Sequence, residues 1–217
     1  MGTIRLTVVA SGSSSGTGAR GACSVNHDHD GRRPTASADS IWLMQVLMTV
    51  QPAFGHLHPV VPLARALAGA GHDVVLASSA SFSSQLAATG VRWLSAGIDW
   101  LESKPHAAFP DITQYRGSAG KQFILGEIFS GRTAVPMALD LLAFADGWRP
   151  DLVIREPWEF GGALLAAKLG IPCVVHGIGR WLNAVEVREA GSVHLQRAAT
   201  TFGVDRGAAL DWVDGDL

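Results

Sequence analysis

The chain has 217 residues, 47% of them hydrophobic, and its 17 basic and 19 acidic residues give a formal net charge of −2. This length and apolar content suffice for a sizeable core, and the balanced charge excludes bulk attraction to nucleic acid or to an anionic membrane surface. The two cysteines, Cys23 and Cys173, lie far apart without metal-ligand spacing, so neither a disulfide framework nor a zinc site is indicated. We expect a globular, cytoplasmic protein that holds no metal.

The first 43 residues differ in composition from the rest. Residues 11–40 are rich in Gly, Ser, Asp and Arg and contain almost nothing large and apolar, so we predict disorder. The "HDHD" at 27–30 offers metal-ligand side chains, but adjacent side chains in a disordered segment rarely converge on one ion. The opening apolar run is too short for a signal peptide, and no segment approaches the ~20 apolar residues of a membrane span. We interpret residues 1–43 as a low-complexity prefix, consistent with a misassigned start, ahead of one domain over 44–217.

From Met44 onward, apolar runs alternate with helical patterns, as is typical of an α/β protein. The apolar run over 45–50 predicts a buried strand, and the pattern from Pro59 to Gly69 predicts the following helix. "HDVVLAS" predicts a second strand, "SFSSQLAATG" a helix and "VRWLSAG" a third strand. Right-handed crossovers would make the sheet of this βαβαβ unit parallel.

The second half of the domain continues the alternation after an irregular stretch. Residues 98–131 lack clear periodicity, and we expect helices or loops there over the ligand side. "AVPMALDLLAFADGW" predicts a helix, "PDLVIRE" a buried strand, "EFGGALLAAKLG" a helix and "IPCVVHG" a strand. A further helix is predicted over 183–202.

Two stretches carry a resemblance to a known family: "FGHLHPVVPLARALAGAGHDVVLAS" and, later, "RPDLVIREPWEFGGALLAAKLGIPCVVHG". Together they resemble the nucleotide-sugar glycosyltransferases of the GT-B architecture, especially bacterial enzymes that glycosylate macrolides, enediynes and other natural products. The resemblance covers residues 44 to 217 and implies a Rossmann-like parallel sheet flanked by helices, the N-terminal, acceptor-binding half of such an enzyme. It implies sugar transfer from a nucleoside diphosphate to a hydroxyl of a hydrophobic natural product, with the nucleotide sugar as co-substrate and no other cofactor.

The resemblance also assigns two catalytic candidates. His56 matches the histidine that acts as general base in the family. Its place after the first strand suits that role, because open α/β sheets bind ligands at the carboxyl ends of strands and a neutral imidazole accepts protons near neutral pH. A histidine that only caps the helix or packs in the turn would fit the same position, and His58 is the weaker candidate. Glu156 matches an acidic residue, more often aspartate, that orients the base, although Glu156 paired with Arg155 at the surface is an alternative.

Five further residues are candidates for substrate binding. Phe54 and Gly55 belong to the turn before the predicted helix, where backbone N–H groups suit a diphosphate or a leaving group. Trp158, Phe160 and Trp181 are aromatic residues that would line an apolar acceptor cleft, with a place in the core as the alternative.

The resemblance stops short of the donor-binding half. A glycine-rich, histidine-containing donor loop does not occur in the 217 residues, so we expect the chain to be truncated and incomplete as an enzyme, or to need a partner chain that supplies the missing domain. The alternative is a non-catalytic aglycone-binding or accessory protein. A nicotinamide-dependent oxidoreductase is disfavoured, because the first turn reads "AFGHLHP" instead of GxGxxG and no acidic residue ends the second strand.

The composition of the prefix yields a first prediction. Removal of residues 1–43 should leave the thermal unfolding midpoint unchanged, because this segment has little apolar surface to bury. Circular dichroism melts of the full and shortened chains at equal concentration would measure the effect. A clear drop in the midpoint would show that the prefix is part of the fold.

Overall fold

The computed structural model describes residues 43–179 and 184–205, with side chains given for 43–179 and 191–205. The predicted prefix therefore lies outside the described residues, apart from Leu43. Within the described part, one parallel sheet has five strands in the order β3-β2-β1-β4-β5. The strands are β1 (Gln45–Thr49), β2 (Asp73–Ser78), β3 (Arg92–Ser95), β4 (Leu152–Arg155) and β5 (Cys173–Val175). This confirms the predicted parallel α/β architecture.

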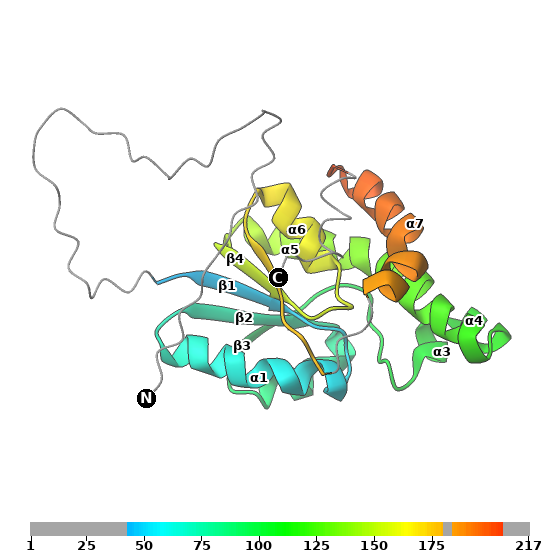
Figure 1. Cartoon of the computed structure of the whole chain (residues 1–217). Coiled ribbons are helices and arrows are strands. Elements are labelled where there is room, and N and C mark those ends of the chain that lie inside the picture. Colours follow the sequence, from blue (N-terminus) through cyan, green and yellow to red (C-terminus); the bar gives the residue numbers. More distant parts are fainter. Residues whose placement is uncertain (1–42, 180–183, 206–217) are drawn as a thin grey trace, which may run out of the picture. The chain divides into compact units, whose positions relative to one another are not determined.

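Helices cover both faces of this sheet, with α1 on one side and α5 and α6 on the other (Figure 1). The two faces follow from the alternation of side chains along β1. Val46 and Met48 pack with residues of α1 in one core cluster, whereas Leu47 packs with residues of α5 and α6 in another. The helices of these layers are α1 (Phe54–Gly69), η1 (Ala80–Phe82), α2 (Ser83–Ala87), α5 (Ala134–Ala145) and α6 (Gly161–Leu169).

Helix α1 begins five residues before the predicted start at Pro59. The backbone N–H of Leu57 already donates to the carbonyl oxygen of Ala53 at 3.0 Å, and Pro59 and Pro62 lie inside the helix. Each proline removes one backbone donor, but the helix continues because Leu57 and Val60 are buried against the sheet. His56 is therefore the third residue of a helix, and the predicted turn is its first turn.

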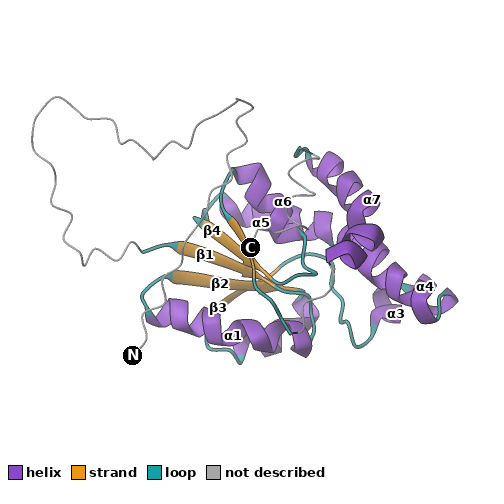
Figure 2. Cartoon of the chain, in the orientation of Figure 1, coloured by secondary structure: helices purple, strands orange, loops and turns teal. Residues whose placement is uncertain are grey.

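From Pro105 onward, the segment without periodicity is mostly helical (Figure 2). It contains α3 (Pro105–Ala108), η2 (Pro110–Gln114), α4 (Gly117–Gln122) and η3 (Phe123–Arg132), and η3 is a π-helix. The backbone N–H of Thr133 donates to the carbonyl oxygen five residues earlier, at Ile128. Such wider turns displace apolar side chains from the usual helical spacing, which explains why the pattern was not recognised.

The last helix in the described part of the chain, α7 (Ala184–Phe202), packs against η3 at two glycines. A Cβ added at Gly191 would lie 2.7 Å from Oγ of Ser130, and one at Gly131 would lie 3.3 Å from Nδ1 of His194. Side chains from both elements, including Phe129 and Leu195, join a third core cluster. Small residues therefore set the close approach of these two helices.

One continuous helix among the described residues, Gly117–Ala145, is long and apolar enough to cross a membrane by length and composition alone. The apolar runs of the sequence predict no such segment. However, 44% of its most apolar window is buried inside the fold, and core helices of α/β proteins pass the same test. Its buried residues, such as Phe129 and Leu141, pack in the core clusters already described. This helix therefore gives little support for a membrane span.

The first turn of α6 allows a stability prediction. A Cβ at Gly162 would lie 2.5 Å from Oγ1 of Thr49 and 3.0 Å from Oε2 of Glu159, so Gly162→Ala should destabilise the fold by about 1–3 kcal/mol. Gly69→Ala is the control, because that exposed helical glycine has nothing within 4 Å of an added Cβ. Urea unfolding would measure both, and equal effects of the two variants would contradict the prediction.

Candidate functional site

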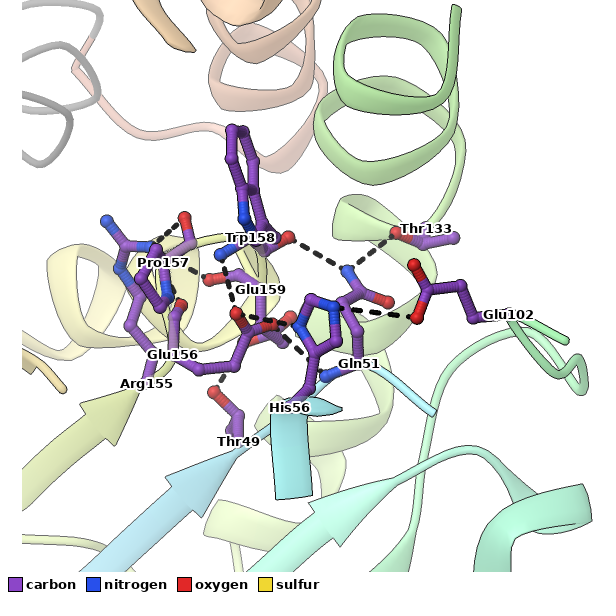
Figure 3. A network of polar contacts seen from close by, with 10 residues as sticks. All are labelled: Thr49, Gln51, His56, Glu102, Thr133, Arg155, Glu156, Pro157, Trp158 and Glu159. Carbon is purple, nitrogen blue, oxygen red and sulfur yellow. Dashed lines mark hydrogen bonds and ion pairs between the residues drawn. The ribbon is translucent and has the colours of Figure 1, made fainter. Parts of the chain in front are cut away.

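The candidate site lies at the topological switch point of the sheet, between β1 and β4, from which successive strands are added in opposite directions. The chain leaves β1 toward β2 and β3 on one side, and leaves β4 toward β5 on the other, while β1 and β4 are direct neighbours. At this carboxyl edge the backbone N–H of Glu156 donates to the carbonyl oxygen of Thr49 at 3.2 Å. In open α/β sheets such a switch point opens the crevice where ligands bind. His56 and Glu156 follow the two strands and meet there (Figure 3).

The two predicted catalytic side chains are in direct contact. Nδ1 of His56 lies 3.0 Å from Oε2 of Glu156, and the side chains are 10% and 0% exposed. The ring N–H is not directed at the carboxylate closely enough for a regular hydrogen bond, so the contact is an ion pair when the ring is protonated. This arrangement fixes the ring by Nδ1 and leaves Nε2 as the nitrogen that can exchange a proton with a substrate.

Backbone groups hold the buried carboxylate of Glu156 in place. The N–H of Gln51 donates to Oε1 at 3.2 Å, and the N–H of Trp158 donates to Oε2 at 2.8 Å. The Gln51 side chain adds a second link, because its Nε2 donates to the carbonyl oxygen of Trp158 at 2.9 Å and to Oγ1 of Thr133 at 3.4 Å. The segments that follow β1 and β4 are therefore tied together around one carboxylate.

The side chain of Arg155 binds the backbone of the turn that follows β4. Its side chain is 2% exposed, and NH1 donates to the carbonyl oxygens of Glu156, Pro157 and Glu159 at 3.1–3.2 Å. The guanidinium also lies over the ring of Phe160, 5.1 Å from its centroid. The alternative of a solvated Arg155–Glu156 surface pair is thus wrong, because both side chains are buried.

Glu159 is a second buried carboxylate that the sequence analysis did not select. It accepts hydrogen bonds from Oγ1 of Thr49 and from the N–H groups of Gly161 and Gly162, the latter two at 2.6 and 2.8 Å. Burial raises the pKa of Glu159 against the effect of these bonds, and the charge of Glu156 raises it further. An acidic residue just before a glycine-initiated helix was the available signal, since carboxylates cap helix N-termini.

A third carboxylate faces the other nitrogen of the imidazole ring. Oε2 of Glu102 lies 3.5 Å from Nε2 of His56, and the Glu102 side chain is 37% exposed. Burial lowers the pKa of His56, but the contact and charge of Glu156 and the charge of Glu102 outweigh it, so this pKa lies above the ordinary value of 6.5. Sequence reasoning missed Glu102 because it belongs to an irregular loop without a motif.

The predicted substrate-binding residues have different surroundings. Phe54 is 55% exposed and its ring contacts the rings of His58 and Phe82, and the neighbouring Gly55 is also exposed. Trp158 and Phe160 are only 5% and 1% exposed and belong to a core cluster, so neither lines an open cleft in this structure. Trp181 lies outside the described residues.

An open cavity of about 580 Å³ is lined by residues of α4, η3 and α7. Its lining includes Tyr115 and Phe123, whose rings are stacked with centroids 4.3 Å apart, and Arg132, which lies over the Phe123 ring at 5.2 Å. Phe129, on the same helix η3, has its ring centroid 6.0 Å from that of His56. The helix that lines the cavity therefore also reaches the candidate base. In the described part of the chain, no group of three His, Cys, Asp or Glu side chains is placed to hold a metal ion.

Solved structures show which class of protein has this architecture. The chain is similar to SsfS6, a glycosyltransferase of Streptomyces sp. SF2575, with 26% identity and a TM-score of 0.60 over 74% of this chain and 47% of that one. It is also similar to the glycosyltransferase SnogD from Streptomyces nogalater, with 28% identity and a TM-score of 0.56 over 75% of this chain and 42% of that one. The fold is the N-terminal half of a GT-B glycosyltransferase.

Residues 65–199 match the family described as erythromycin biosynthesis protein CIII-like, N-terminal domain, and the chain belongs to this family. Similar sequences include an L-demethylnoviosyl transferase of Streptomyces niveus, 35% identical over 63% of this chain and 35% of that protein. A 10-deoxymethynolide desosaminyltransferase of Streptomyces venezuelae is 31% identical over 58% of this chain and 34% of that protein. The chain spans about a third of the length of these relatives. The matched range contains Glu102 and Glu156 and begins after His56.

The raised pKa of His56 leads to a prediction about stability and pH. A group whose pKa is higher in the folded state stabilises the fold below its unfolded pKa, and this contribution is lost as pH rises through the folded pKa. His56→Gln should therefore destabilise the protein more at pH 6 than at pH 9, as measured by urea unfolding at both values. His58→Gln is the control, because His58 is exposed and contacts Phe54. If His56→Gln lowered the free energy of unfolding by the same amount at both pH values, the raised pKa of His56 in the folded state would be contradicted.

Proposed function

We propose that the chain is the acceptor-binding half of a glycosyltransferase that moves a sugar from a nucleoside diphosphate to a hydroxyl of a hydrophobic natural product. The observation that carries this proposal is the contact between Nδ1 of His56 and the fully buried carboxylate of Glu156 at the switch point of the sheet. A base with an orienting carboxylate is the arrangement needed to activate a hydroxyl group. The family and the fold support the same reaction class.

The proposed step is a displacement at the anomeric carbon. Nε2 of His56 takes the proton of the acceptor hydroxyl while its oxygen forms the new bond to the sugar. The bond between the anomeric carbon and the diphosphate oxygen breaks, and the nucleoside diphosphate leaves with that electron pair. Glu156 orients the ring and stabilises the imidazolium that results, and the base step requires neither a metal nor an organic cofactor.

The acceptor is proposed to be largely apolar. Tyr115, which is 40% exposed and stacked on the buried Phe123, offers an apolar ring in the cavity beside η3. Arg132 lines the same cavity with its guanidinium paired to Asp111 and Glu127. Phe54, Gly55 and Trp181 stay candidates for contact with substrate, whereas the packing of Trp158 and Phe160 gives them an indirect role through the turn that contains Glu156. The nucleotide sugar would be held mainly by the donor-binding half of a GT-B enzyme, on the same protein or a partner chain. We expect the reaction to take place in the cytoplasm.

The assignment of the base can be tested by sugar transfer in a chimera that joins residues 44–217 to the donor domain of a homologous transferase. His56→Ala should lower the transfer rate by about 10²–10⁴-fold, the usual contribution of a general base. Glu156→Gln should lower it less, because the ring keeps its position but loses the carboxylate charge. His58→Ala, which removes the exposed neighbouring histidine, should retain the parent rate. Unchanged transfer by His56→Ala would disprove the role of His56.

The alternative of a non-catalytic accessory protein predicts acceptor binding without sugar transfer. Calorimetry of the natural chain with a hydrophobic hydroxylated acceptor measures the binding, and the transfer assay of the chimera separates the two functions. Acceptor binding by the natural chain, together with transfer by the chimera, supports the enzyme. Acceptor binding without transfer in any chimera would favour the accessory role.

A further inference from the structure

We propose that Glu102 is a positioning residue that holds the protonated ring of His56 by Nε2 in the free protein and gives way to the acceptor hydroxyl. This inference rests on the proposed function for its catalytic meaning, but the contact itself is a property of the free chain. Oε2 of Glu102 lies 3.5 Å from Nε2, on the side of the ring opposite to Glu156 (Figure 3). The imidazole is therefore placed between two carboxylates.

The number of ring protons decides which state fits this geometry. A neutral imidazole has one N–H and one lone pair, so it can face only one carboxylate favourably. With Nδ1–H toward Glu156, the lone pair on Nε2 would point at the negative oxygen of Glu102. An imidazolium carries a positive charge and a hydrogen on each ring nitrogen, so it is attracted to the carboxylate oxygen near each nitrogen. The two contacts at 3.0 and 3.5 Å thus favour the protonated ring in the free protein.

The other groups around the ring do not reverse this preference. Phe129 of η3 faces the ring edge to face and carries no charge. Gln51 and Thr133, from the loop after β1 and the end of η3, are neutral. Behind Glu156 lie the buried carboxylate of Glu159 and the guanidinium of Arg155, which is bonded to backbone carbonyls of the same turn. Within residues 43–179 and 191–205, Glu102 and Glu156 are therefore the charged side chains in direct contact with His56.

The attachment of Glu102 permits its side chain to leave. Its backbone N–H donates to the carbonyl oxygen of Pro52 at 3.2 Å, which fixes the residue beside the start of α1. No backbone N–H holds its carboxylate among the described residues, in contrast to that of Glu156, and 37% of its side chain is exposed. When the Glu102 side chain leaves, the neutral ring is no longer disfavoured, so Nε2 can release its proton to solvent. An acceptor hydroxyl then takes the place of the carboxylate at Nε2 and gives its proton to the freed lone pair. After proton transfer, the new Nε2–H again has Glu102 within reach, which stabilises the imidazolium.

The test is a nuclear magnetic resonance titration of the full chain with nitrogen-15-labelled histidine. The chain has eight histidines, so His56→Gln identifies the His56 signals by their loss. In Glu102→Gln the His56 titration midpoint should fall by about half a pH unit or more, because a charge near one ring nitrogen is removed from a partly exposed position. Asp146→Asn is the matched control, because it removes one negative charge at the exposed end of α5 and should leave the midpoint unchanged.

Two outcomes decide the inference. A lower His56 midpoint in Glu102→Gln, with a further variant Glu102→Asp between it and the parent, supports the contact at Nε2. An unchanged midpoint in a folded Glu102→Gln protein would overturn it. In the transfer-competent chimera, Glu102→Gln should move the acid limb of the pH–rate profile to lower pH, which a purely structural role would not do.

The titration is independent of catalysis. If His56→Ala kept full transfer activity, the proposed function would fail while the Glu102 titration could still succeed. If His56→Ala abolished transfer and Glu102→Gln left the midpoint unchanged, only the role of Glu102 would fail.

Discussion

The burial of the Glu156 carboxylate is the constraint on which the rest of the site depends. An ionised group that is fully buried is stable only when hydrogen-bond donors and an opposite charge surround it. Two backbone N–H groups from the segments after β1 and β4 supply the donors, and the ring of His56 supplies the partner. The carboxylate of Glu156 therefore fixes the positions of Gln51, Trp158 and the first turn of α1 relative to one another.

A second buried carboxylate, that of Glu159, ties the end of β1 to the start of α6. Glu159 connects Thr49 at the end of β1 with the first N–H groups of α6. Gly161 and Gly162 allow the close approach, because a side chain at either position would meet Met137, Thr49 or Glu159 itself. The turn between β4 and α6 thus has a carboxylate at each end, one directed at His56 and one directed at the helix. Both carboxylates are buried, with Glu156 0% and Glu159 1% exposed.

The sequence allowed the regular parts of the fold and the two central residues to be predicted. Buried strands such as β1 and β4 are short continuous apolar runs, which a sequence pattern identifies. His56 and Glu156 were selected by the resemblance to glycosyltransferases, and the position of His56 after the first strand suits a ligand site. The start of α1 was placed five residues late, because Pro59 resembles a first-turn proline while burial of Leu57 and Val60 carries the helix through it. The π-helix η3 is not predictable from apolar spacing, because its wider turns depart from the 3.6-residue period of an α-helix. Glu102 and Glu159 are isolated acidic residues whose roles depend on tertiary neighbours that no local pattern encodes.

The pairing of β1 with β4 has a consequence for how the molecule folds. Contacts between segments far apart along the chain require closure of a long loop, and this slows their formation. The hydrogen bond from Gln51 to Glu156 joins residues 105 positions apart. Strands β1 and β2 are close in the sequence and can pair early. The imidazole of His56 contacts the carboxylate of Glu156 only after β4 has paired with β1. The chemical shift of His56 would therefore report completion of the native topology, and an assembly intermediate with β1, β2 and β3 formed would contain the histidine without its buried carboxylate.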